Sequence, residues 1–346
     1  MTGIDRRELL FGSVSALAGA LPATAFAEGT SKLGAAAFYK RSPLRVLIGA
    51  PAGSRYEALG RLIAPHLARR LSTQVSIETA HGGATGALRQ LGDMPADGTV
   101  MAMVSAEATL IRQLLGTRGN EVDASSLNWL AGLSGSPKLW LASRSSSLRS
   151  VQDAVRARQL RWPAAGPADT FSDVAAILSY ALGLKSKIVT GFSGPSDMAR
   201  AVIDRNADCC LLPADTALRS AQFAELHPLA VLAPHRVQDH PNVPPITEVY
   251  QLPSDRKWML DLRMEIGAIQ QALVMTHGVP AYRVGYLRKA LSDVLANETV
   301  LNEAKAARLT LSHSGGAALQ TRISAALKQA VPRSAEFRKV ALGTYL

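Results

Sequence analysis

The segment from Leu44 to Leu71 contains a buried strand, a short glycine-containing loop and a helix in succession, and it constrains the fold more than any other part of the chain. Val46–Ile48 is a short apolar run, typical of strands buried on both faces of a parallel sheet. After Glu57, apolar residues recur at helical spacing. Free backbone N–H groups at the start of such a helix favour a bound anion. The same residues also fit an ordinary turn in which Ser54 caps the helix.

Similar units recur along the chain, and together they predict an α/β fold. Strands are predicted over residues 75–78, 100–104, 139–142, 160–162, 187–190, 208–212 and 229–232, and most of them precede a polar or glycine-containing loop and a helix. Two sets of three strand–loop–helix units predict two doubly wound α/β domains with a hinge between them. Ligands of such sheets bind outside the carboxyl ends of the strands. We therefore expect two sets of loops that face each other across a cleft.

The order of the predicted strands also suggests domain boundaries. We expect a discontinuous first domain made of residues 44–141 and 233–346, and a second domain made of residues 142–232. Residues 28–43 are mostly small or polar, and they predict a flexible lead-in to the first strand.

The N-terminal residues have the pattern of an export signal. Arg6 and Arg7 precede a mildly apolar stretch, and Ala25-Phe26-Ala27 is a small-residue cleavage pattern. Residues 1–27 therefore resemble a twin-arginine signal peptide, which would direct the folded protein to the periplasm. The alternative is an uncleaved anchor, but the stretch is short and weakly apolar for a membrane span.

The composition narrows the class of ligand. The chain has 346 residues and 47% hydrophobic residues, which is enough for two globular domains. Its formal net charge of +11 favours anionic solutes, whereas scattered basic residues and an aromatic content of 5% speak against nucleic acid. Cys209 and Cys210 are adjacent in an apolar run, and no Cys/His spacing indicates zinc. We expect no metal and no cofactor.

Several short segments, in order, resemble one family. Pro51-Ala52-Gly53 followed by Glu57 is similar to the signature P-A-G-G-S-T-D-x-x-A-R. Residues 95–99 resemble a P-D-G-x-T turn, residues 162–170 a Y-x-S-x-G-x-G-S loop, and residues 236–248 the pattern R-x-P-x-x-P-D-V-P-T-x-x-E. These are patterns of the Bug (TctC-like) extracytoplasmic solute-binding proteins of tripartite tricarboxylate transporters. The resemblance extends from about Leu44 to the end of the chain.

The resemblance implies a two-lobed venus-flytrap receptor, similar to type II periplasmic binding proteins. Such a receptor captures a small carboxylate-containing ligand and delivers it to membrane transporter subunits. We expect a monomer that binds without catalysis. Two alternatives are an orphan sensor that presents its ligand to a membrane partner and a periplasmic enzyme on the same fold, although the chain lacks the G-x-S-x-G, H-E-x-x-H and Walker A motifs.

The expected ligand site consists of residues in the loops that follow the predicted strands. In the first domain these are Ala52, Gly53, Ser54, Glu57, His81, Gly82, Gly83, Thr85 and Ser105, and in the second domain Ala165, Gly166, Asp169, Thr170, Phe192, Ser193 and Asp215. Backbone N–H groups at these loop–helix junctions would hold the carboxylate. Four positions, Ser54, Glu57, His81 and Phe192, differ from the residues of the family pattern, so the resemblance does not name the ligand.

Overall fold

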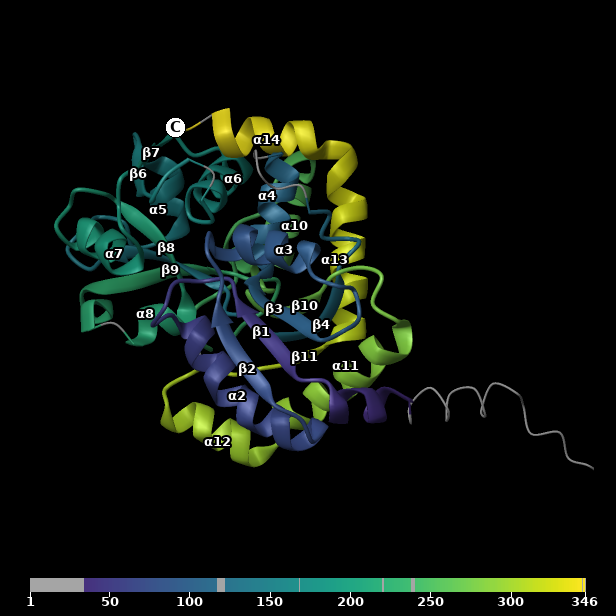
Figure 1. Ribbon diagram of the computed structural model, residues 1–346. Coiled ribbons are helices and arrows are strands. Elements are labelled where there is room, and N and C mark those ends of the chain that lie inside the picture. Colours follow the sequence, from purple (N-terminus) through teal and green to yellow (C-terminus); the bar gives the residue numbers. More distant parts are fainter. Residues whose placement is uncertain are drawn as a thin grey trace, which may run out of the picture.

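The computed structural model describes residues 34–116, 122–167, 169–219, 221–237, 240–343 and 345, and they form two α/β lobes (Figure 1). The predicted signal peptide and residues 28–33 of the predicted lead-in lie outside the described residues. Within the described part, no helix combines the length and the apolar composition that a membrane span requires.

A six-stranded sheet forms the centre of the first lobe. Its strands are β1 (Leu44–Ile48), β2 (Val75–Thr79), β3 (Val100–Ser105), β4 (Asn128–Ser134), β10 (Gln271–Met275) and β11 (Ser314–Gly315), in the spatial order β11-β4-β10-β3-β1-β2. β1 pairs in parallel with β2 and β3, whereas β10 lies antiparallel between β3 and β4. The helices of this lobe are α2 (Arg55–Leu71), α3 (Gly83–Asp93), α4 (Ala106–Leu115), α11 (Ala281–Leu295), α12 (Glu298–Ala306) and α13 (Gly316–Ala330).

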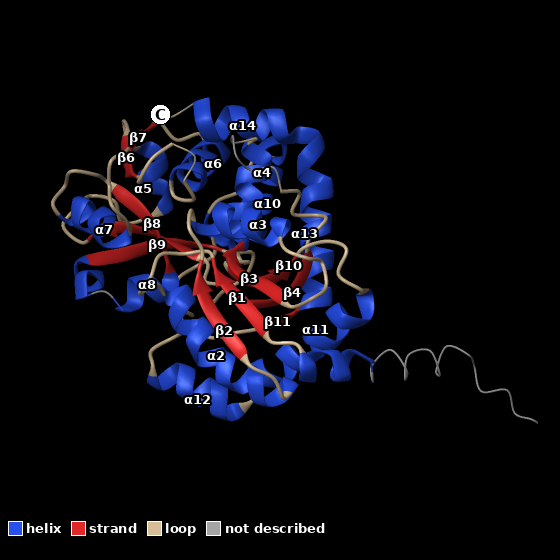
Figure 2. Cartoon of the chain, viewed as in Figure 1, coloured by secondary structure: helices blue, strands red, loops and turns tan. Residues whose placement is uncertain are grey.

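Helices cover both faces of this sheet, as Figure 2 shows, and the side chains of β1 illustrate why. Val46 and Ile48 belong to the hydrophobic cluster that contains Leu59 of α2, whereas Leu47 belongs to the cluster that contains Leu110 of α4. Successive residues of a strand point to opposite faces, so a run of consecutive apolar residues needs a helix on each side.

The described residues of the second lobe form five strands. They are β5 (Lys138–Ser143), β6 (Leu160–Pro163), β7 (Ser186–Val189), β8 (Cys209–Pro213) and β9 (Leu226–Leu232). β6 and β7 are parallel, and β5 lies antiparallel between β8 and β9. β8 starts beside β6, because the N–H of Asp208 donates to the carbonyl of Arg161 at 3.0 Å. The helical segments here are α5 (Val151–Arg156), α6 (Ser172–Leu182), α7 (Pro195–Ile203), α8 (Ala214–Arg219) and the 3₁₀ segment η1 (Ala221–Glu225).

The last segments connect the two lobes. They are α9 (Ile246–Val249), α10 (Ser254–Gly267), η2 (Val331–Arg333) and α14 (Ser334–Gly343). α10 and α14 both contact α4 of the first lobe and α6 of the second. One hydrophobic cluster contains Leu110, Leu178, Leu260 and Phe337, each from one of these four helices. The junction between the lobes is therefore a packed core on this side of the molecule.

The predicted α/β class and the two-lobed organisation are confirmed, with differences in the strand pairing. β4, β10 and β11 were not predicted, and β10 and β5 run antiparallel to their neighbours. The predicted boundary after residue 141 falls inside β5, which pairs entirely within the second lobe. The chain therefore crosses between the lobes at residues 135–137, where β4 ends and β5 has not begun.

The prediction of a flexible lead-in is wrong for its described part. Residues 34–41 are helical, and Ala35 and Tyr39 are fully buried. The Tyr39 ring stacks on Tyr286 of α11 with 5.8 Å between centroids, and its hydroxyl donates to the carbonyl of Gly98 at 3.1 Å. The helix is ordered by partners that lie far away in sequence, which small residues alone could not indicate.

Candidate functional site

The loop between β1 and α2 closes on itself through two of the predicted residues. The hydroxyl of Ser54 accepts a hydrogen bond from the N–H of Glu57 at 3.4 Å, and the Glu57 carboxylate accepts from the N–H of Gly53 at 2.7 Å. This arrangement is similar to a capping box, except that the carboxylate accepts from the residue before the N-cap instead of from the N-cap Ser54 itself. The Gly53 N–H and the Arg61 guanidinium lower the pKa of Glu57. Glu57 therefore holds the loop together, and Ala52 and Gly53 form its exposed tip.

The loop between β2 and α3 leaves its helix start open. Gly82 and Gly83 have positive φ angles of 82° and 63°, and α3 begins at Gly83 with no side-chain cap among the described residues. A Cβ at Gly86 would lie 1.8 Å from the carbonyl oxygen of His81, so only glycine allows the loop to wrap this closely. His81 is exposed, and Thr85 lies in the first turn of α3. The first N–H groups of α3 therefore have no side-chain acceptor from the N-cap, and an anion at this edge of the lobe could accept from them.

The first two loops are neighbours. A Cβ built on Gly49, at the end of β1, would lie 3.0 Å from the Cα of Ala84 in the first turn of α3. Ser105 ends β3 beside them and caps α4, because its hydroxyl accepts from the N–H of Ala108 at 3.1 Å. Burial raises the pKa of the Tyr56 phenol, and a hydrogen bond with Ser105 opposes this shift. The ends of β1, β2 and β3 thus meet at one edge of the sheet.

In the second lobe, Asp169 holds its own loop. Its carboxylate accepts hydrogen bonds from the N–H groups of Gly166 at 2.7 Å, Phe171 at 2.5 Å and Ser172 at 2.9 Å. Three N–H donors use most of the acceptor capacity of this carboxylate. Ala165 is exposed, and a Cβ on Gly166 would meet no atom within 4 Å, so the tip of this loop faces open space.

The loop between β7 and α7 lies against the same segment. The N–H of Phe192 donates to the carbonyl of Ala164, and the N–H of Gly191 donates to that of Ala165, both at 3.2 Å. Phe192 packs against the hydrophobic cluster of α7 and β8, whereas Ser193 is exposed. The Ser193 N–H donates to the Asp197 carboxylate at 2.9 Å. The structure therefore brings the predicted residues of β6 and β7 together at one edge of the second lobe.

A direct ion pair joins the loops of the two lobes. Arg55, the first residue of α2, pairs through Nη1 with the Asp215 carboxylate of α8, and Figure 1 shows α8 next to the start of α2. The Arg55 Nη2 also donates to the carbonyl of Thr310 at 2.7 Å. Sequence reasoning named Asp215 but missed Arg55. A signal was present, because a cation in the first turn of a helix opposes the helix dipole and calls for a nearby anion.

A buried network of four charges joins α4, β5, α6 and α10, and the sequence did not predict it. Glu107 of α4 accepts from Lys138 Nζ at 2.5 Å and from Arg263 Nη2 at 2.7 Å. Arg263 of α10 also donates to Asp173 of α6, with 2.8 Å between Nε and Oδ2, and to the carbonyl of Thr170 at 3.1 Å. Two cations thus face two carboxylates across the lobe junction, and Thr170 is tied to this network through its backbone.

Burial and charge pull the pKa values of this network in different directions. Burial raises the pKa of Asp173 against the attraction of Arg263, and it lowers the pKa of Lys138 against the attraction of Glu107. Burial would also raise the pKa of Glu107, but Lys138 and Arg263 together hold it below its usual value. A neutral cluster of four charged groups can be buried because each charge has a partner.

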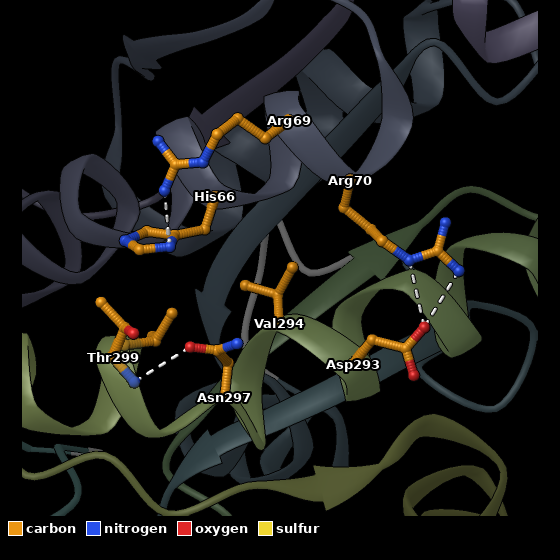
Figure 3. Close-up of a pocket in the computed structure, with 8 residues that line it drawn as sticks. His66, Arg69, Arg70, Asp293, Val294, Asn297 and Thr299 are labelled. Atoms are coloured by element: carbon orange, nitrogen blue, oxygen red, sulfur yellow. Dashed lines mark hydrogen bonds and ion pairs between the residues drawn. The ribbon is translucent and has the colours of Figure 1, made fainter.

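A separate cavity of about 330 Å³ lies on the outer side of the first lobe, between α2 and the α11–α12 region (Figure 3). Arg70 donates to Asp293 at 2.9 Å there, and His66 contacts Glu303 at 2.7 Å. These residues lie near the end of α2, which is roughly 20 Å from Arg55 at a rise of 1.5 Å per residue. None of the predicted ligand residues lines this cavity.

The cysteines and metal ligands give no second site in the described chain. Cys209 and Cys210 are buried, and burial raises the pKa of the Cys210 thiol to about 12. Among the residues with described positions, no three His, Cys, Asp or Glu side chains are grouped so that they could hold a metal ion.

Comparisons with known proteins identify the fold. No protein-family model matches the sequence, and no curated protein matches it. Among solved structures, a TctC solute-binding protein from Polaromonas aligns with a TM-score of 0.70 at 15% identity, over 87% of this chain and 98% of that one. A Rhodopseudomonas palustris protein with adipate aligns with a TM-score of 0.65 at 16% identity, over 87% and 98% of the two chains. MatC from the same organism, with bound malate, aligns at 0.60 and 18% identity, over 87% and 99%. The chain therefore has the fold of the TctC solute-binding proteins, as its sequence motifs predicted.

Proposed function

We propose that this protein is a periplasmic solute-binding protein that holds a small carboxylate-containing ligand between its two lobes and delivers it to a tripartite tricarboxylate-type transporter. The observation that carries the proposal is the contact of Arg55 with Asp215, which places loops from the strand ends of both lobes next to each other. Ligands of doubly wound sheets bind at such edges. Malate and adipate, found with two proteins of the same fold, are small dicarboxylates.

The proposed site uses backbone donors more than side chains. The uncapped start of α3 in the first lobe offers N–H groups and the positive end of a helix dipole. The exposed loop tips at Ala165 and Ser193 provide the facing surface in the second lobe. Glu57 and Asp169 serve in this proposal as residues that shape the loops, because their carboxylates are already engaged by backbone N–H groups. We propose binding without catalysis, in a monomer that takes up no nucleic acid or cofactor.

The proposed location follows from the N-terminal sequence. The twin-arginine pattern and the small-residue motif before Glu28 support export of the folded protein and cleavage after Ala27. Expression with the Arg6 and Arg7 codons changed to lysine codons tests this route. Export should fall sharply with the double substitution, whereas unchanged export would reject the twin-arginine pathway.

The experiment for the function is a binding measurement on the mature chain, residues 28–346. Malate, adipate, succinate, citrate and acetate are titrated by calorimetry, with the neutral diamide of adipic acid as the control ligand. At a concentration a hundred times its dissociation constant, a true ligand should stabilise the fold by about 2.7 kcal/mol. If no acid in an extended panel of mono- and dicarboxylates binds or stabilises, the carboxylate proposal is wrong.

A charge placed at the start of α3 tests the location of the site. Thr85→Glu adds a negative charge that suits the helix dipole, so the fold should persist, but the charge should weaken acid binding by at least about tenfold, or 1.4 kcal/mol. Gln90→Glu makes the same change of charge near the other end of α3 and serves as the matched control. Equal affinities for the two variants would place the ligand elsewhere.

A further inference from the structure

We propose that Arg55 receives one carboxylate of the ligand, and that the Asp215 carboxylate occupies Arg55 until the ligand displaces it. This inference rests on the proposed function and names the specificity-determining pair of that site. No sequence motif predicted that Arg55 and Asp215 would be in contact. They stand 160 residues apart, on different lobes.

The position of Arg55 favours the binding of an anion. In the signature P-A-G-G-S-T-D, which this segment resembles, a serine stands where this chain has Arg55. A guanidinium in the first turn of α2 is unfavourable with respect to the helix dipole. It is also partly buried, since 22% of its side chain is exposed. A cation kept in such a place needs an anion, and the site proposed here is one that an anion enters.

The hydrogen bonds of the Arg55 guanidinium also support this role. Nη1 pairs with Asp215 and Nη2 donates to the carbonyl of Thr310, whereas the buried Nε has no hydrogen-bond partner among the described residues. Arginine offers five N–H donors in a fixed fork, and a carboxylate can take two of them in parallel. The contact with Asp215 is made through Nη1. The guanidinium therefore retains capacity for a better-fitting carboxylate.

The environment of Asp215 supports its role as the group that the ligand displaces. Its side chain is 11% exposed, and its backbone N–H donates to the hydroxyl of Ser136 at 3.0 Å, which fixes the start of α8. The hydroxyl of Thr216 lies 3.4 Å from its carboxylate. Asp215 is thus held at the junction by its backbone, while its carboxylate imitates the carboxylate of a ligand. A ligand that brings a single carboxylate must compete with it directly.

We call the displacement of Asp215 from Arg55 by the ligand the exchange. If it occurs, removal of the acidic side chain of Asp215 should tighten ligand binding. Asp215→Asn keeps the size of the side chain but removes its charge, so malate and adipate should bind about tenfold more tightly, which is 1.4 kcal/mol. Arg55→Gln should weaken both acids by at least about tenfold, and it should do so with or without Asp215→Asn. Asp204→Asn, which removes an exposed carboxylate from an ion pair at the end of α7, is the control and should leave both affinities unchanged.

The test is calorimetric titration of the mature chain and these variants with malate and adipate, together with the melting temperature of each variant alone. Asp215→Ser replaces Asp215→Asn if the latter fails to fold. Tighter binding by the Asp215 variants and loss of binding in Arg55→Gln support the exchange. If malate or adipate binds the parent chain but Asp215→Asn binds equally or more weakly, the exchange is wrong while the proposed function stands. If neither acid binds any variant, and the wider acid panel also fails, the proposed function falls and the exchange falls with it.

Discussion

Arg263 of α10 donates to Asp173 of α6 across the lobe junction, with 2.8 Å between Nε and Oδ2, and the two side chains are 1% and 0% exposed. Glu107 and Lys138 complete the cluster. Buried charges are costly unless each is paired, so this geometry allows only a narrow range of arrangements for the four elements that carry it. We infer that the network orients the second lobe relative to the first.

Removal of one partner should be far more damaging than removal of the pair. Arg263→Met leaves the Asp173 carboxylate buried beside no hydrogen-bonded cation, so it should cost about 3–5 kcal/mol in the free energy of unfolding. Arg263→Met combined with Asp173→Leu should recover much of that loss. Arg322→Met, which breaks a 40% exposed contact with Glu265 at 3.5 Å, is the control and should cost less than about 1 kcal/mol. Urea denaturation followed by circular dichroism measures all three, and equal losses for Arg263→Met and Arg322→Met would contradict the account.

The contribution of Glu107 to the free energy of unfolding should decrease as the pH falls. Its pKa in the folded protein is below the ordinary value of 4.5, so its stabilisation is present above that value and is lost as the pH falls through the lower folded value. Glu107→Gln should therefore be destabilised at pH 7. The difference in unfolding free energy between it and the parent chain should shrink below pH 4.5. Urea titrations from pH 7 to pH 3 check this, and a difference that stays constant over this range would refute it.

The buried thiols should make the folded protein less stable at alkaline pH. Burial raises the pKa of Cys210 from the ordinary 9.0 to about 12. A group with a raised folded pKa contributes stability below its unfolded value and loses it as the pH rises through the folded value. Stability should therefore fall as the pH rises from 9 towards 12, and Cys210→Ala should lose less stability over that interval. Reaction with a thiol reagent should also be slow until the chain unfolds, and rapid reaction of the folded protein at pH 8 would contradict the buried positions.

The helix over residues 34–41 should contribute to the stability of the first lobe. Tyr39 is fully buried, stacks on Tyr286 and donates to the carbonyl of Gly98. Tyr39→Ala should cost about 3–5 kcal/mol, because it removes a buried aromatic ring and leaves a cavity. Tyr282→Ala removes a tyrosine that is 39% exposed on α11 and should cost much less. If thermal denaturation shows equal losses for the two variants, the helix is not anchored by Tyr39.

Local pattern was sufficient for most of the described strands and insufficient for β4, β10 and the two-residue β11. Gln271–Met275 is a run of five buried residues, which periodicity alone cannot distinguish from part of a buried helix. Asn128–Ser134 contains Gly132, which suggests a loop, but a Cβ there would lie 2.5 Å from the hydroxyl of Ser314. That glycine serves close packing against β11. The pairing of β5, inside which the predicted boundary falls, has a similar cause, because its partners are strands more than 60 residues away.

The site shows the same division. The cap at Ser54 and the glycine turn at Gly82 were predicted, because caps and glycine turns depend on neighbours a few residues apart. The sequence could not show whether Glu57 and Asp169 contact a ligand or hold their own loops, because either role needs a carboxylate at the same position. The structure engages both with backbone N–H groups. Arg55 was missed because its partner lies in another lobe.

Sequence alone determined the elements whose physics is local: the alternation of buried strands, glycine-containing turns and amphipathic helices that makes this an α/β protein of two lobes. Tertiary structure decided the antiparallel insertion of β10, the buried four-charge network and the contact of Arg55 with Asp215. The reason is that hydrogen bonds within a turn or helix join residues a few positions apart. The cost of burying a charge, by contrast, is settled only when residues distant in the chain meet and compensate one another.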